Sequence, residues 1–152
     1  MENESAQQLW ESFQIQNPHL PDSYDVWAFG DTKEMADELA ALVLEGLKTM
    51  TCSLKRLYEV NNEPLPKEKA YSVILDGEGQ AVGIIQTLEV KVFPFDEVTE
   101  EVAAGEGEGD RSVAYWTEAH KVFFKRECEQ ISEPFSTKMA VVCETFELVF
   151  AA

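Results

Sequence analysis

Residues 46–51 read GLKTMT, in which Lys48 stands three positions before Thr51. A threonine hydroxyl becomes a nucleophile only when a nearby base takes its proton, and a neutral lysine amine is such a base. With a reference pKa of ~10.4, an exposed lysine is neutral in fewer than about a thousandth of molecules at pH 7. Residues 48 and 51 also face opposite sides of a regular strand, so the chain must bend if both are to reach one site. Otherwise Lys48 complements a helix dipole and Thr51 merely begins a strand.

Other residues with chemical potential lack the sequence context that their chemistry needs. Cys52 and His120 could form a nucleophile and base, but no local signature supports them, and a lone cysteine is usually a small apolar residue. EGEGD at 106–110 has carboxylates at alternate positions, but a calcium loop needs glycine and glutamate where Arg111 and Thr117 stand. This segment also lacks the GK[ST] sequence of a phosphate-binding loop.

Cysteine content and charge exclude several classes of protein. Three cysteines without CxxC spacing favour neither a disulfide framework nor a zinc site, and we expect no metal and no cofactor. The 152-residue chain has 12 basic and 29 acidic residues, a formal charge of −17, which disfavours an extended footprint on duplex nucleic acid. Seven carboxylates and no base lie between Asp96 and Asp110, and the simplest interpretation of that run is a solvated loop.

Apolar periodicity predicts helices before and after a set of strands. Residues 5–16 and 31–45 have helical spacing; Asp31 is the expected N-cap of the second helix, with Glu34 completing a capping box. Gly46 fits the left-handed position just past that helix. Alternating apolar residues predict strands at 71–75, 82–92 and 138–150, and helical spacing returns at 112–129. This order favours an α+β fold, and a small curled barrel with helices against it satisfies the pattern.

Length and hydropathy predict one domain in the cytoplasm. A chain of 152 residues is typical of a single domain. The N-terminus is acidic and amphipathic, unlike a secretory signal, and no apolar run approaches the ~18 residues of a membrane span. We therefore expect a soluble cytoplasmic protein that does not bind a membrane.

Several short motifs occur in the order found in one known family. GLKTMT resembles the G-x-K-x-x-[ET] signature of ASCH domains, which are similar to PUA domains and share their small β-barrel. Five further motifs resemble those of the longer bacterial ASCH proteins: Trp27-Ala28-Phe29-Gly30, Asp76-Gly77, Val92 to Thr99, Ala104 to Asp110, and Trp116 to Phe124. The resemblance implies a single PUA-like ASCH domain over 1–152, a small β-barrel with 1–45 as its helical N-terminal part and a further helix packed against it.

The resemblance also implies an active site. In a shorter ASCH subfamily, which is similar to N(4)-acetylcytidine amidohydrolases, a lysine, a threonine and a glutamate are catalytic. Their counterparts here are Lys48, Thr51 and, by its spacing after Thr99-Glu100, Glu106. Many ASCH proteins have glutamate where Thr51 stands, so the threonine is typical of the hydrolase pattern.

Two functions follow from this resemblance. The first is hydrolysis of an acylated nucleoside such as N(4)-acetylcytidine, with Thr51 as nucleophile, Lys48 as its base and Glu106 as proton donor. The second is a module that binds a nucleotide or short RNA, with or without ribonuclease activity, in which Lys48, Arg111 and Lys55 are the candidates for phosphate contact. The acidic charge favours the small substrate.

The expected substrate-binding residues each have a second interpretation. Trp27 and Phe29 would stack on a base or belong to the core, and His120 would contact substrate or be a partly buried histidine on an apolar helix face. Electrostatics also leave two states of the catalytic pair open. Either Lys48 is desolvated and Glu106 is held protonated, or Lys48 stays charged and stabilises an oxyanion or phosphate.

Overall fold

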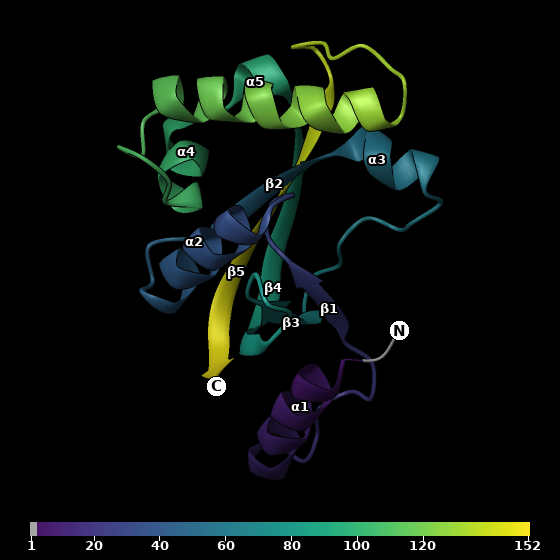
Figure 1. The fold of residues 1–152 in the computed structure, drawn as a ribbon, viewed down its shortest axis with the longest axis vertical. Helices are drawn as coiled ribbons and strands as arrows, with labels where there is room; N and C mark the ends of the chain where they lie inside the picture. The colour runs from purple at the N-terminus through teal and green to yellow at the C-terminus, as the bar shows by residue number, and fades with distance from the viewer. Residues whose placement is uncertain (1–2) are drawn as a thin grey trace. The chain divides into compact units, whose positions relative to one another are not determined.

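The computed structural model describes residues 3–152, and Figure 1 shows its helices and strands. The helices of these residues are α1 Glu4–Gln16, α2 Lys33–Leu44, α3 Lys55–Val60, the 3-10 turn η1 Phe95–Glu97, α4 Glu100–Glu106 and α5 Val113–Gln130. The strands are β1 Asp25–Ala28, β2 Met50–Leu54, β3 Tyr71–Leu75, β4 Ala81–Pro94 and β5 Ala140–Ala151. The fold class is therefore α+β, as predicted. No helix within 3–152 is long and apolar enough to cross a membrane.

The chain divides into two compact units. Unit 1 contains residues 3–47, 68–88 and 146–152, and unit 2 contains 48–67 and 89–145. The strand order of the sheet is β1-β3-β4-β5-β2. In unit 1, β1 pairs parallel with β3, and β3 pairs antiparallel with β4. In unit 2, β2 pairs antiparallel with β5. One domain over 1–152 remains a prediction.

The predicted helix bounds lie within two residues of those observed, but the predicted N-cap of α2 is wrong. The N-cap of α2 is Thr32, not Asp31, because the Thr32 hydroxyl accepts the backbone N–H of Met35 at 3.1 Å. The helix therefore begins one residue later than the predicted capping box requires. Gly46 has the expected left-handed backbone, with φ +82°, and the N–H of Leu47 bonds back to Leu42 O at 2.9 Å. This Schellman arrangement ends α2.

Five short elements were not predicted as such: β1, β2, α3, η1 and α4. The expectation of a solvated loop at 96–110 is wrong in part, because Thr99 caps α4 through the N–H of Val102 and the helix continues to Glu106. The acidic residues of that helix differ in environment. Glu100 and Glu101 are exposed, whereas Glu106 is 2% exposed.

Each unit has its own apolar core. In unit 2 a single cluster packs one face of β2 and β5 against α4 and α5, through Cys52, Leu54, Val102, Trp116, Phe124, Val141 and Cys143. In unit 1 one cluster packs α2 against the sheet and another packs α1 against it. The core of unit 2 fixes the elements that carry Lys48, Thr51 and Glu106.

Candidate functional site

The C-terminal end of α4 lies along the outer edge of β2. β2 is the last strand in the sheet order, so the N–H groups that do not face β5 need other partners. The N–H of Thr49 donates to Gly105 O at 2.7 Å, and the N–H of Cys52 donates to Glu106 Oε1 at 3.0 Å. In a regular strand, N–H groups three residues apart point to opposite edges. The chain therefore departs from a regular strand between Thr49 and Cys52.

Lys48 and Glu106 form a buried ion pair. Lys48 Nζ lies 3.1 Å from Glu106 Oε1, although the residues are 58 positions apart in sequence, and each residue is only 2% exposed. The same ammonium is 3.4 Å from Glu106 O and 3.8 Å from Glu108 Oε2. Glu108 follows the left-handed cap Gly107, which turns the chain after α4. Lys48 is thus held by two carboxylates from one helix end.

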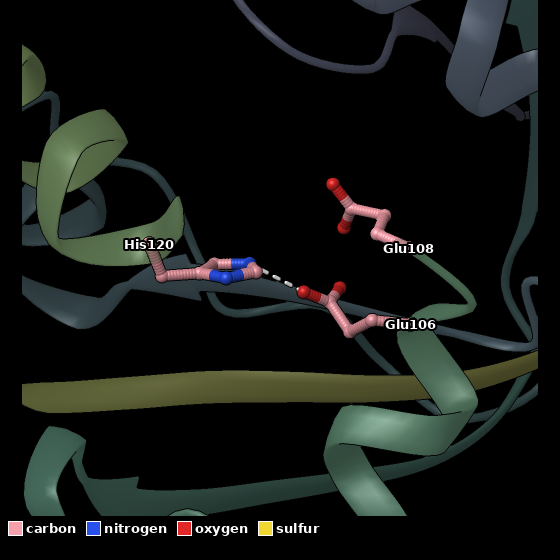
Figure 2. Close-up of side chains that lie close together, drawn as sticks. All are labelled: Glu106, Glu108 and His120. Atoms are coloured by element: carbon pink, nitrogen blue, oxygen red, sulfur yellow. Dashed lines mark ion pairs between the residues drawn. The ribbon is translucent and has the colours of Figure 1, made fainter. Parts of the chain in front are cut away.

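The second oxygen of Glu106 is held by α5. Trp116 Nε1 donates to Glu106 Oε2 at 3.1 Å, and His120 Nε2 pairs with the same oxygen, as Figure 2 shows for the imidazole. His120 Nδ1 lies 2.9 Å from Trp116 O. A carbonyl can only accept a hydrogen bond, and so can an ionised carboxylate. With an acceptor at each ring nitrogen, His120 fits this site best as the doubly protonated imidazolium.

The pKa directions agree with that geometry. Burial opposes ionisation of Glu106, but the charge of Lys48 and the hydrogen bond from His120 outweigh it, so its pKa falls from 4.5 to about 2. Burial likewise opposes the imidazolium of His120, but the hydrogen bond and charge of Glu106 raise its pKa above 6.5. Glu106 is therefore ionised at neutral pH. Of the two states that the sequence left open, a protonated Glu106 does not fit this environment.

The same group of side chains could hold a metal ion. Ligand atoms of Glu106, Glu108 and His120 lie within 4.8 Å of one another. Figure 2 shows that the two glutamates lie on the same side of the His120 ring. A cation bound by these three would meet the ammonium of Lys48, and His120 Nε2 would first have to lose its proton. Two cations facing two carboxylates already balance the charge, so ion pairing explains the cluster without a metal.

Thr51 is close in the chain to this cluster, but within residues 3–152 its side chain makes no hydrogen bond or ion pair with it. Its side chain is half-buried, and within residues 3–152 its hydroxyl has no hydrogen-bond partner. Side chains alternate along β2, so Thr51 faces away from the core that Cys52 and Leu54 enter. Glu144 is its direct partner on β5.

The other predicted binding residues lie elsewhere. Trp27 and Phe29 are in unit 1, where their rings meet edge to face at 4.7 Å and pack in the cluster that includes Leu39. These contacts are those of core residues. Arg111 is exposed, has φ +65°, and donates from Nε to Ala104 O at 3.0 Å. Among these predictions, the structure brings together Lys48, Glu106 and His120.

Cys52 and His120 do not form a nucleophile and base. Burial, then the hydrogen bond with Cys143, raises the pKa of the Cys52 thiol, while both nitrogens of His120 are engaged. All three cysteines are buried and free. Sequence reasoning did not select Trp116 and Glu108 as site residues. Both lie inside motifs that carry the family resemblance, Trp116 to Phe124 and Ala104 to Asp110, which is the signal that could have found them.

Comparison with known proteins identifies the family. A family model described as the ASCH domain matches residues 25–150, so the chain belongs to the ASCH domain family. None of the curated proteins searched is significantly similar to it.

Solved structures support the same assignment. Protein EF3133 from Enterococcus faecalis V583 is 37% identical, with a TM-score of 0.91 over 97% of this chain and 89% of that protein. The ASCH domain from Lactobacillus crispatus JV V101 is 32% identical, with a TM-score of 0.90 over 99% of this chain and 96% of that one. The hypothetical protein PH0355 shares the fold, with 20% identity and a TM-score of 0.54 over 82% of this chain and 99% of that protein. The chain therefore has the PUA-like fold that the resemblance implied.

Proposed function

We propose that this ASCH-domain protein hydrolyses the amide of a small acylated nucleoside, such as N(4)-acetylcytidine. The observation that carries this proposal is the buried ion pair of Lys48 and Glu106, which lies at the edge of the strand that bears Thr51. A hydrolase of the Lys-Thr-Glu type requires these three residue types near one another. Thr51 is the member that is not buried, so we assign contact with the substrate to its hydroxyl.

The surroundings of each residue suggest its role. Glu106 accepts from four donors and is ionised. We therefore propose that Glu106 holds Lys48 in place and does not donate a proton. If Lys48 were the base, it would have to lose a proton beside that carboxylate, and the ion pair would be lost with it. We therefore assign to the buried Lys48, paired with Glu106, the positioning of the start of β2, the strand that bears Thr51.

Binding of RNA or nucleotide phosphate is the weaker alternative. Lys48 already has two carboxylates, Glu106 and Glu108, within 3.8 Å, so a phosphate there would meet like charge. The formal charge of −17 also repels polyanions at long range.

Turnover of N(4)-acetylcytidine by Thr51→Ala tests the proposal. We expect kcat to fall by at least about a hundredfold with little change in substrate affinity, because the loss is in the chemical step. Thr49→Ala is the matched control, since Thr49 is exposed and uses its backbone N–H, not its side chain, to hold α4. Equal turnover by Thr51→Ala and wild type, or no turnover by wild type, would reject the proposed hydrolysis.

A further inference from the structure

The charged cluster leaves the nucleophile without a base. Lys48 is paired with Glu106, and the two oxygens of Glu106 are occupied by Lys48 and Cys52 on one side and by Trp116 and His120 on the other. A threonine hydroxyl is a weak nucleophile until a base takes its proton. If Thr51 acts as proposed above, the proton must go to another group that lies on its face of the sheet.

The strand register identifies one such group. Thr51 on β2 is paired directly with Glu144 on β5. Directly opposed residues of an antiparallel pair point to the same face, with Cβ atoms roughly 4.5–5.5 Å apart. A glutamate side chain is long enough to span that gap, so a change of rotamer at Glu144 would bring its carboxylate to the hydroxyl. Core residues Cys52 and Cys143, which are also paired, point to the opposite face.

This face of β2 and β5 is polar and partly shielded from water. Glu144 is 9% exposed, an unusual position for a glutamate. Ser53, two residues after Thr51 and on the same face, shares a 2.9 Å hydrogen bond with the hydroxyl of Tyr58. Burial raises the pKa of Tyr58, the bond with Ser53 opposes this, and the negative charge of Glu144 adds to the rise. Glu144 thus lies near this polar cluster, within range of its electrostatic influence.

We propose that Glu144 is the general base that activates Thr51. This inference rests on the proposed hydrolysis and adds a fourth residue to Lys48, Thr51 and Glu106. The carboxylate takes the proton of the Thr51 hydroxyl while Oγ bonds to the acyl carbon. The resulting carboxylic acid gives that proton to the nitrogen as the C–N bond breaks, which releases the amine.

Water completes the reaction. Glu144, again a carboxylate, takes a proton from a water molecule that attacks the acyl-threonine, and the ester bond to Thr51 breaks. Thr51 Oγ recovers the proton from Glu144, and the acyl group leaves as a carboxylic acid. Atoms balance as one amide and one water giving one acid and one amine.

Acetylation of Thr51 by p-nitrophenyl acetate tests this step without the nucleoside. The site of acetylation is located by tandem mass spectrometry, and its rate is followed in wild type and variants. We expect Glu144→Gln to slow acetylation of Thr51 by roughly 10²–10⁴-fold, since glutamine cannot accept the proton. Glu147→Gln, an exposed position on the same strand, is the matched control and should acetylate at the wild-type rate.

The outcomes separate this inference from the proposed substrate. Equal acetylation of wild type and Glu144→Gln, or no acetylation of Thr51 in wild type, overturns the role of Glu144. Acetylation that depends on Glu144, together with no hydrolysis of N(4)-acetylcytidine, rejects that substrate and keeps the base. If circular dichroism shows that Glu144→Gln is unfolded, the rate of Thr51 acetylation is measured in Glu144→Asp instead. A reduced but measurable rate supports the role, and a rate equal to wild type overturns it.

Discussion

At the scale of single residues, Glu106 is the centre of the site. Its two oxygens accept from Lys48, Cys52, Trp116 and His120, so four donors from three parts of the chain converge on one carboxylate. Removing one member of a buried ion pair leaves the other charge unpaired, which costs more than the pair itself contributes. Glu106 is therefore important for stability as well as for the proposed chemistry.

We expect Glu106→Gln to lower the free energy of unfolding at pH 7 by about 3–5 kcal/mol in urea titrations, because Lys48 and His120 lose their ionised partner. The pKa of Glu106 is lowered, so its contribution is present above about 4.5 and is lost as pH falls toward about 2. The difference between wild type and Glu106→Gln should shrink over that range. Glu101→Gln, exposed on the same helix, should change stability by less than about 1 kcal/mol. Equal stability of Glu106→Gln and wild type would contradict the ion-pair account.

At the scale of elements, α4 closes the edge of β2. The close approach of α4 to β2 depends on Gly105, since a Cβ built there would lie 2.5 Å from Met50 Sδ and 3.1 Å from Met50 Cβ. The carbonyl of Gly105 is also the acceptor for the N–H of Thr49. A small residue in the last turn of α4 thus lets the next residue, Glu106, reach the strand.

Gly105→Ala should destabilise the protein by about 1–3 kcal/mol, because α4 or Met50 must move to admit the new methyl group. The double variant Gly105→Ala/Met50→Ala supplies the control. If the clash is the cause, the double variant should be more stable than the sum of the two single effects predicts, by about 0.5–3 kcal/mol in a double-mutant cycle of urea unfolding. Strict additivity would mean that α4 does not depend on this contact.

At the scale of the whole molecule, the negative charge limits the choice of partner. We expect short single-stranded RNA to bind weakly and with a steep loss of affinity between about 50 and about 200 mM salt, because each phosphate contact gives a slope near −0.7. Fluorescence anisotropy of a labelled RNA measures this dependence. An uncharged nucleoside is the control, and its affinity should change little with salt. Tight RNA binding that persists at high salt would argue for the binding-module interpretation.

The long periodic elements were predictable from sequence. α1, α2, α5 and the strands β3, β4 and β5 fall within a few residues of their predicted bounds, because their apolar residues repeat with the period of the structure they form. The motifs likewise gave the family and the nomination of Lys48 and Glu106. Gly46 marked the end of α2 because its left-handed backbone is a local property of that residue.

What only the tertiary structure decided depends on contacts between distant segments. β1 and β2 have four and five residues and are held by pairing with β3 and β5, so their own sequence carries little signal. Glu106 looks like one more acid in a run of seven, and only the approach of Lys48, Trp116 and His120 makes it a buried anion. The pairing of Thr51 with Glu144, 93 positions later (144 − 51), is likewise set by strand register, which spacing along the chain does not specify.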